Sequence, residues 1–331
     1  MPLHLPGVTL CCVDTTDRFP WAVRAMARSM AELQFGDAFI ASDEARLAAL
    51  PLLEGVRPLR IEPLRSIDAY SRFMIERLPA LVRTAHVLIV QWDGFVIHPD
   101  RWRDDFLQYD YIGAPWHYHE GPHRVGNGGF SLRSRRLLQA LPPLPDHFDE
   151  PEDRFICQTW RPQAEALGLK FAPPGLAAEF SIDFGDLDGR PFGFHGPAHF
   201  PEVLGAAATE AYLRTLDPAR QFAQRASRDV MLGIAADLER LRSRRPELDA
   251  LRASLSAHLA ASVEAAPLQG IEVDELDRLC RGLIRYGYAG AALALLRRAA
   301  PRFGAARTAV LRAKLALRAL QRRARGTPVN A

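Results

Sequence analysis

The stretch Val87–Pro99, VLIVQWDGFVIHP, does most to decide the fold of this chain. Its first residues form a short apolar run, and such a run bounded by turn-forming residues predicts a buried β-strand. The strand ends at Gln91-Trp92-Asp93-Gly94, which holds a carboxylate at the end of a strand. An alternative is that Asp93 only caps the turn into a β-hairpin, and this segment alone does not decide between the two.

Short apolar runs alternate with helical patterns on the N-terminal side of this strand. Strands are predicted at Val8–Val13 and Ala38–Ala41, and helices at Trp21–Leu33 and Ser66–Val82. Alternation of this kind is typical of an α/β protein with a parallel, doubly wound sheet.

Acidic residues follow three of the predicted strands, namely Asp14, Asp43 and Asp93. In a doubly wound sheet, ligands gather at the carboxyl ends of the strands. We therefore expect these carboxylates at one binding edge. A divalent ion held there would neutralise a diphosphate, and oxygen ligands suit Mg²⁺ or Mn²⁺.

Three shorter patterns follow on the C-terminal side. Glycines surround Asn127 in VGNGGFSLR, residues 125–133, and allow the backbone to approach a ligand closely. Pro151-Glu152-Asp153 opens a predicted helix, and FGFHG, residues 192–196, places His195 at the end of a strand. Each pattern also has an ordinary explanation: a tight turn, carboxylates favoured by the helix dipole, or a structural histidine.

The composition changes near Gly205, where Ala, Leu and Arg become dominant. Residues 205–331 contain 22 Lys and Arg against 12 Asp and Glu, whereas residues 1–204 carry a net charge of −7. Recurring amphipathic patterns predict an all-α region of antiparallel hairpins. The predicted helices are Glu210–Leu216, Arg228–Arg242, Leu248–Ser262, Glu272–Tyr286, Ala289–Arg298 and Ala305–Arg325. We expect two domains, residues 1–204 and residues 205–331.

The composition also argues against several classes of protein, including membrane-spanning and nucleic-acid-binding proteins. No apolar run reaches the roughly 18 residues of a membrane span, and the N-terminus lacks the pattern of a signal peptide. Four cysteines without metal-like spacing fit reduced thiols, so we expect a cytoplasmic protein. The acidic N-terminal part predicts no nucleic-acid partner. The arginine-rich helix Ala305–Arg325 suits a peripheral contact with the inner membrane face, or it is simply a solvated face.

Five motifs in order carry a resemblance that spans about residues 7–200: VQWDG, YIGAPW, VGNGGFSLRS, PEDRFIC and FGFHG. Their order is similar to the common core of GT-A glycosyltransferases. More closely, the motifs resemble an uncharacterised bacterial family of GT-A-like glycosyltransferases. The resemblance implies a GT-A-like nucleotide-sugar-binding sheet and transfer of a sugar, a hexose being typical, from a UDP-linked donor to an acceptor hydroxyl. The acceptor class is left open between a glycan, a lipid-linked sugar and a protein.

The resemblance also implies roles for single residues. It makes Asp93 and His195 ligands of Mn²⁺ or Mg²⁺, and it makes Asp153, with Glu152 beside it, the general base of an inverting reaction. Gln91 stands where the family's metal motif has its first carboxylate, so we expect weak metal binding without nucleotide. The donor-binding positions that it implies are Asp14, Asp43, Arg72, Gln91, Trp92, Asn127, Gly128 and Gly129.

Two other functions are consistent with the sequence. A nucleotidyltransferase on a similar sheet would need more metal-binding carboxylates and basic residues after the first strand, where Asp14-Thr15-Thr16-Asp17 stands. A non-catalytic sugar-binding or scaffold protein would need none of Asp93, Asp153 and His195. The histidines at 117, 119 and 123 lack a Cys or Asp partner nearby, which favours an acceptor loop or solvent exposure over a zinc site.

Overall fold

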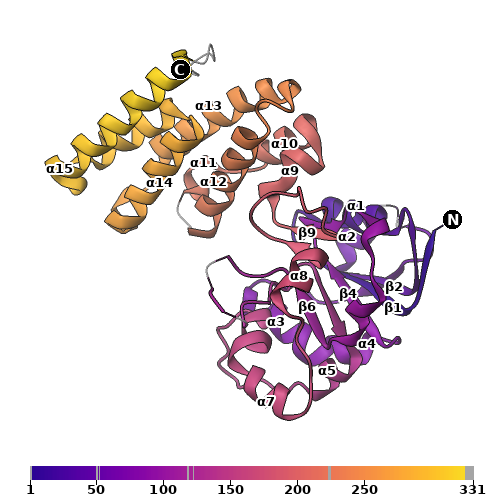
Figure 1. Cartoon of the computed structure of the whole chain (residues 1–331). Coiled ribbons are helices and arrows are strands. Elements are labelled where there is room, and N and C mark those ends of the chain that lie inside the picture. The colour runs from indigo at the N-terminus through magenta and orange to yellow at the C-terminus, as the bar shows by residue number, and fades with distance from the viewer. Residues whose placement is uncertain are drawn as a thin grey trace. The chain divides into compact units, whose positions relative to one another are not determined.

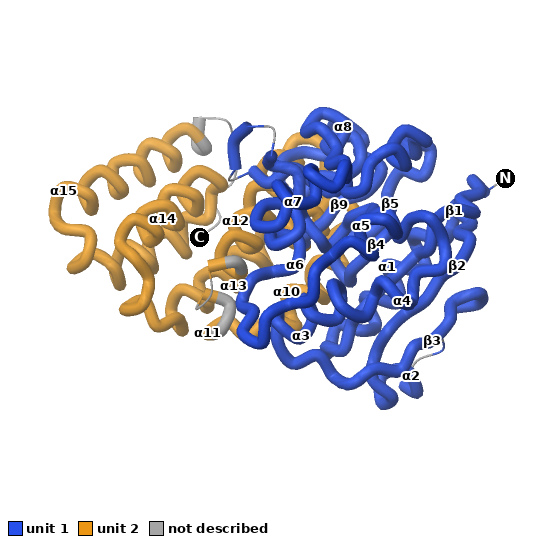
Figure 2. Tube along the Cα trace, turned by 90° about the horizontal axis from the view of Figure 1, so that it is seen from below, with its two compact units in different colours: residues 1–196 blue, residues 197–331 orange. Residues whose placement is uncertain are grey.

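The computed structural model describes residues 2–49, 51, 53–117, 119–121, 123–222 and 225–324. The chain divides into two compact units, residues 1–196 and residues 197–331, which Figure 2 separates by colour. Each unit is described below by itself. The predicted α/β class of the first part and the predicted helical class of the second are confirmed (Figure 1).

A six-stranded sheet with the order β3-β2-β1-β4-β7-β6 forms the centre of the first unit. Its strands are β1 (Leu3–Val13), β2 (Leu33–Ser42), β3 (Arg57–Arg60), β4 (His86–Val90), β6 (Tyr111–Gly113) and β7 (Ser131–Ser134). The first four pair in parallel, as expected. The last two strands of the sheet differ from these four, because β7 runs antiparallel to both β4 and β6.

A second, three-stranded sheet has the order β5-β9-β8. It consists of β5 (Gly94–Val96), β9 (Gly193–His195) and β8 (Ser181–Ile182). The chain leaves β4, turns at Trp92-Asp93 and enters β5, and a bridge between Gln91 and Gly94 closes this turn. Because Gly94 pairs with His195, the turn that carries Asp93 lies beside the end of β9.

Short helices connect these strands: α1 (Phe19–Met30), α2 (Glu44–Ala49), α3 (Ile67–Arg72), α4 (Leu78–Leu81), α5 (Arg135–Ala140), α6 (Glu152–Arg154), α7 (Arg161–Ala166) and α8 (Pro174–Phe180). The predicted helix Ser66–Val82 and the predicted helix that starts at Pro151-Glu152-Asp153 each contain a π-helical turn, η1 (Phe73–Arg77) and η4 (Phe155–Thr159). Such turns are frequent at functional sites.

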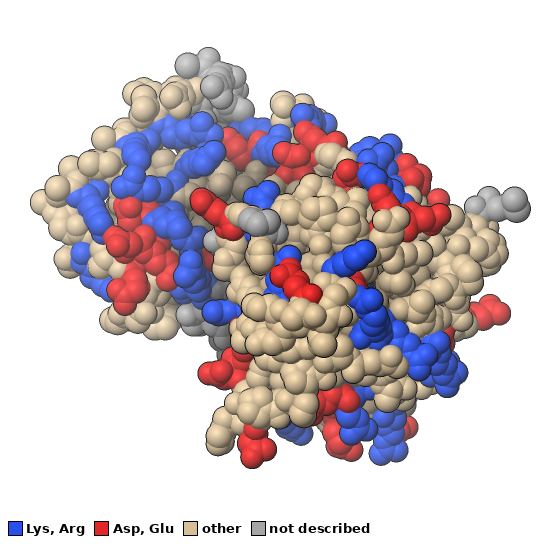
Figure 3. Space-filling view, turned by 60° about the horizontal axis from the view of Figure 1, so that its bottom comes forward, with Lys and Arg blue, Asp and Glu red and all other residues tan. Residues whose placement is uncertain are grey.

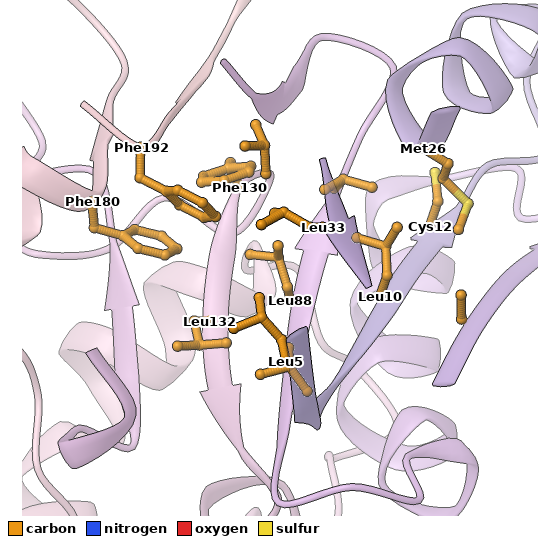
Figure 4. Packing of buried hydrophobic residues seen from close by; sticks show 14 of the residues in the cluster. Leu5, Leu10, Cys12, Met26, Leu33, Leu88, Phe130, Leu132, Phe180 and Phe192 are labelled. Carbon is orange, nitrogen blue, oxygen red and sulfur yellow. The ribbon is translucent and has the colours of Figure 1, made fainter. Parts of the chain in front are cut away.

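Apolar side chains bury both faces of the central sheet. Successive residues of β4 alternate, so that Leu88 and Val90 join the core on one face and Val87 and Ile89 join the core on the other. In Figure 4, Leu88 lies beside Leu132 and Phe130 in the first of these cores. Burying a side chain of this kind stabilises the fold by roughly 1.5–3 kcal/mol. The sheet is thus a rigid support for the residues at its edge.

The second unit is helical. Its longer helices are α10 (Gly205–Arg214), α12 (Arg225–Arg240), α13 (Asp249–Ala265), α14 (Val273–Tyr286) and α15 (Ala289–Ala324), with the short α9 (Phe200–Val203) and α11 (Pro218–Gln221). Gly304 is non-helical at φ 71° and divides α15 into two helices, as predicted. Within the described part of the chain, no helix is long and apolar enough to cross a membrane.

Two predictions about this unit stay open. The domain boundary was expected after residue 204, and residues 197–204 group here with the helices that follow. Membrane contact through the last helix also stays a prediction. Leu317 and Leu320 of this helix are exposed, and Arg325 lies outside the described residues.

Candidate active site

The ends of three strands and the start of a fourth lie at one edge of the central sheet. Asp14 follows β1, Asp43 follows β2, and Gln91 and Asp93 follow β4, and these three strands run in parallel. Because β7 runs in the opposite direction, its first residue pairs with Ile89 near the end of β4. The glycines that precede β7 therefore reach the same edge as the carboxylates.

Asp93, His195 and Gln91 lie together at this edge. The His195 Nε2 atom is 3.6 Å from Asp93 Oδ1 and 3.3 Å from Gln91 Oε1. Gln91 Nε2 donates to the Tyr70 hydroxyl at 2.8 Å, which turns the amide oxygen toward His195. A side chain at Gly129 would place its Cβ 2.0 Å from His195 Nε2, so only glycine leaves room for this group.

Burial and neighbouring charges shift the pKa values of Asp93 and His195. Burial raises the pKa of Asp93, and the charges of His195 and Arg18 oppose this shift. Burial lowers the pKa of His195, but Asp93 and Asp183 outweigh it and raise the value to about 9. Asp93 Oδ1 is buried and has no hydrogen-bond partner. The group therefore presents an unsatisfied carboxylate oxygen next to an imidazole.

These residues fit a divalent metal ion. The set consists of a carboxylate, an imidazole and an amide oxygen, and the imidazole favours Mn²⁺ over Mg²⁺, which prefers oxygen ligands. Across the described residues there is no cluster of three or more His, Cys, Asp or Glu side chains that could hold a metal by itself. The third donor here is Gln91, and further ligands would have to come from a diphosphate or water.

Asp153 lies beside Gly128, whereas His195 lies beside Gly129. Its Oδ2 accepts a hydrogen bond from the Gly128 amide at 2.9 Å, and its Oδ1 accepts one from the Arg154 amide at 2.8 Å. Burial and the charge of Glu152 raise the pKa of Asp153 to about 6. The helix dipole does not offset this increase, because α6 has only three residues and burial has the largest effect. The carboxylate is still mostly ionised at neutral pH.

Glu152 has a different environment from its neighbour. It forms an ion pair at 2.5 Å with Arg133, whose side chain is fully buried on β7. The Arg133 guanidinium also lies 5.2 Å from the ring centroid of Tyr111. At Gly128, a Cβ would lie 2.3 Å from Glu152 Oε1, so this glycine is needed for the two carboxylates to fit. Glu152 thus neutralises a buried cation.

The remaining predicted donor-binding residues are distributed around this edge. Asp14 accepts hydrogen bonds from the amide and hydroxyl of Thr16, and Asp43 pairs with Arg46 at 2.7 Å. Trp92 stacks under the Arg18 guanidinium, whose carbon lies 4.0 Å from the ring centroid.

Two of the predicted residues have distinctive local structure. Asn127 is buried with a φ of 59°, and its Oδ1 has no hydrogen-bond partner. Arg72 pairs with Asp68 at 3.2 Å and donates to the carbonyls of Pro145 and Asp146. Arg72 therefore ties the 142–150 loop to α3 in this structure, and its role at the nucleoside stays a prediction.

Two functional candidates were missed in the sequence. Asp183 Oδ1 lies 3.5 Å from His195 Nδ1, and Arg18 acts electrostatically on both Asp14 and Asp93. Asp183 follows the two-residue strand β8, which is too short to show a periodic pattern. Arg18 stands one residue beyond the segment Asp14–Asp17, so its position after the first strand was the available signal.

The histidine-containing loop between β6 and β7 packs against this region. The ring of His117 lies 4.2 Å from that of Phe184, the neighbour of Asp183. His119 Nε2 is 2.7 Å from Gln158 Nε2 on η4, the turn that follows Asp153. No zinc cluster forms among the residues that the structure describes.

One family model matches part of the chain. A family model described as "Protein of unknown function (DUF5672)" matches residues 55–195, which include Gln91, Asp93, Asp153 and His195. No curated protein matches the chain.

Several solved glycosyltransferases are similar to this chain. The apo form of GlyE from Streptococcus pneumoniae TIGR4 aligns at 13% identity and a TM-score of 0.37, over 59% of this chain and 54% of that chain. The mannosyltransferase PcManGT from Pyrobaculum calidifontis, solved with GDP-Man and Mn²⁺, aligns at 11% identity and a TM-score of 0.37, over 96% and 82%. The galactosyltransferase LgtC, solved with donor and acceptor sugar analogs, aligns at 13% identity and a TM-score of 0.35, over 60% and 92%. Similarity at this level does not show which reaction the protein catalyses.

Proposed function

We propose that this protein is a metal-dependent glycosyltransferase that moves a hexosyl group from a nucleotide-diphosphate sugar, UDP-linked in the first instance, to an acceptor hydroxyl. The observation that carries the proposal is the grouping of Asp93, His195 and the Gln91 amide oxygen at one sheet edge, with Asp153 across Gly128 and Gly129. This arrangement provides separate sites for a leaving diphosphate and for an acceptor proton.

The residues at the leaving-group side would hold the metal. Asp93, His195 and Gln91 are its protein ligands in this proposal, and when bound the ion supplies positive charge to the departing diphosphate. The Arg18 guanidinium, stacked on Trp92, adds a fixed positive charge on the same side. The buried surroundings strengthen these interactions relative to water.

Asp153 would act as the general base. The bond between the anomeric carbon and the diphosphate oxygen breaks while the acceptor oxygen forms a new bond on the opposite face, through an oxocarbenium-like state. Asp153 takes the proton of the acceptor hydroxyl. The amides of Gly128 and Arg154 hold the carboxylate in place. Attack from the opposite face inverts the anomeric configuration.

The other predicted residues take binding roles in this proposal. The glycines at 128 and 129 let the donor sugar approach the backbone, and the unsatisfied amide oxygen of Asn127 is available to a sugar hydroxyl. Asp14, Asp43 and Arg72 would surround the nucleoside.

A screen of nucleotide sugars by thermal shift, with and without Mn²⁺, tests the proposal. We expect one donor to raise the melting temperature only when the metal is present, and turnover of that donor to stop in EDTA. Asp93→Ala should remove turnover while the fold survives. Asp100→Ala, which removes an exposed carboxylate in an ion pair with Arg190, is the matched control and should keep turnover. Full activity in EDTA, or full activity of Asp93→Ala, would contradict the metal-dependent mechanism.

A further inference from the structure

We propose that Asp183 is a positioning residue that holds the His195 imidazole with its Nε2 atom toward Asp93 and Gln91 and thereby sets the metal affinity of the site. The inference deepens the function proposed above and rests on it. Asp183 does not touch the metal or the reacting atoms in this account, and it acts only through His195.

Strand pairing places Asp183 beside His195. The strand β8 runs parallel to β9, with Ile182 opposite Phe194, so that the next residues of the two strands are Asp183 and His195. The Asp183 Oδ1 atom lies 3.5 Å from His195 Nδ1, and both side chains are mostly buried. The Asp183 carboxylate therefore faces Nδ1, the ring nitrogen that points away from Asp93.

Gly196 supports this arrangement independently. Its φ is +95°, and a Cβ at this position would lie 3.2 Å from Asp183 Oδ1. Its amide donates to the Asp93 carbonyl at 2.8 Å. One residue thus leaves space for the Asp183 carboxylate and fixes the turn that carries Asp93. The backbone at Gly196 therefore keeps Asp93 and Asp183 in fixed positions around His195.

The chemistry of imidazole explains why this matters for a metal. A neutral imidazole has one nitrogen that donates a proton and one that has a free lone pair. When a carboxylate accepts the proton of Nδ1, the lone pair is at Nε2, the atom that faces Asp93 and Gln91. Metal-binding histidines commonly have such a carboxylate partner, and its loss typically costs about 10–100-fold in metal affinity.

A purely structural ion pair would behave differently. Removing it would lower the melting temperature without changing how the protein binds metal. The two roles are separated by measuring metal affinity and metal coordination directly on the full chain.

The experiment titrates Mn²⁺ into the full-length protein and follows free Mn²⁺ by electron paramagnetic resonance, with and without UDP. We expect Asp183→Ala to weaken Mn²⁺ binding about 10–100-fold. Asp183→Asn should lose less, because its amide oxygen can still accept from Nδ1 and its shape is unchanged. Asp186→Ala is the matched control, since Asp186 is an exposed carboxylate in the same loop, and its affinity should equal that of the wild type.

The visible absorption of bound Co²⁺ gives a second readout, because it reports nitrogen ligation. Asp183→Ala should change this spectrum, whereas Asp186→Ala should not. Wild-type affinity in both Asp183 variants would overturn the positioning role and leave the proposed function intact. If the wild type itself binds no Mn²⁺ even with UDP, the metal-dependent function fails together with this inference.

Discussion

The two units of this protein both bury charged side chains, but they do so in different ways. In the first unit, Asp93 has a buried oxygen without a hydrogen-bond partner, and Asp153 accepts hydrogen bonds from two backbone amides. In the second unit, arginine side chains donate to carbonyls near helix ends, as the buried Arg252 does to Leu238 and the half-buried Arg298 does to Ala266. The first arrangement leaves the Asp93 oxygen without a hydrogen-bond donor. The second provides donors for the carbonyl groups at the helix ends.

This difference supports the catalytic roles that we propose for Asp93 and Asp153 in the first unit. Helix C-termini leave carbonyls without partners, and arginine can satisfy them, so part of the positive charge of the second unit stabilises its fold. On the face that Figure 3 shows, basic and acidic side chains are interspersed. The buried carboxylates Asp93 and Asp153 of the first unit have raised pKa values, which is common at functional sites. Burial also raises the pKa of Asp237 in the second unit to about 6, but Asp237 forms an ion pair with Arg240.

The largest expected effect comes from Asp153. Replacing it with Asn preserves its shape and removes its basicity, so turnover should fall about 10²–10⁴-fold, as is typical when a general base is lost. The affinity for the donor should change little, because the metal ligands stay in place. Steady-state kinetics with the product's anomeric configuration determined by NMR check both claims. Near-normal turnover would refute the role, and retention of configuration would refute the inverting mechanism.

Ionisation of Asp153 should have opposite effects on activity and stability: as the pH rises, turnover should increase and stability should decrease. Turnover requires the ionised form, so it should rise as the pH increases through about 6. Because the folded pKa is raised, the protonated form favours the folded state. That stabilisation is complete below the unfolded pKa of about 4 and is lost as the pH rises through about 6. The melting temperature of the wild type relative to Asp153→Asn should therefore fall between pH 4 and pH 7.

The next largest effect concerns Glu152, the neighbour of Asp153. Glu152→Gln keeps an oxygen near Arg133 but leaves a buried guanidinium without a counter-charge, which should cost about 3–5 kcal/mol of unfolding free energy. Glu179→Gln is the matched control, because its partner Arg103 is exposed and such pairs contribute about 0–1 kcal/mol. Denaturant unfolding measures the loss of unfolding free energy in both variants. Equal losses would show that the buried ion pair stabilises the protein no more than the exposed one.

Much of the site could be predicted from particular residues. The apolar run before Gln91 identified β4, and the turn residues after it placed Asp93 at the sheet edge. The glycines at 128 and 129 were expected to allow close approach to a ligand, and this stays a prediction; in the structure they leave room for the side chains of Glu152 and His195. These signals are local, because an apolar run or a glycine reflects its own backbone.

The rest depends on contacts between distant segments. The direction of β7, the Arg133–Glu152 pair and the contact of Asp183 with His195 leave no periodic pattern, because the strands concerned have only two to four residues. Their partners lie in different parts of the chain and meet only through the sheet.

A smaller effect is expected at the helix ends of the second unit. Arg298 donates to the carbonyls of Val263 and Ala266 at the end of α13. Arg298→Ala should destabilise the protein by about 1–3 kcal/mol, because it leaves those carbonyls without their donor. Donor affinity should be unchanged. The exposed neighbour Arg297 provides the control variant Arg297→Ala, which should have wild-type stability. Equal stability of the two variants would argue against the structural role of this arginine.

The smallest effect on donor binding is expected from removing the second unit, because every proposed site residue lies between Asp14 and His195. The site of truncation should decide whether the product is soluble. A chain that ends at Gly196 keeps β9 and the hydrogen bond from Gly196 to the Asp93 carbonyl.

A chain that ends at residue 204 keeps Phe200, which is fully buried in the complete protein and packs edge-to-face on Tyr212 at 5.2 Å. Removing Tyr212 and α12 would expose this ring and the apolar residues around it. We therefore expect the chain ending at Gly196 to be monomeric and to bind the donor as the complete protein does, and the longer one to aggregate. Size-exclusion chromatography and donor titration test this. If the shorter chain does not fold even with donor and Mn²⁺, the two units share stabilising contacts and the unit boundary is not a domain boundary.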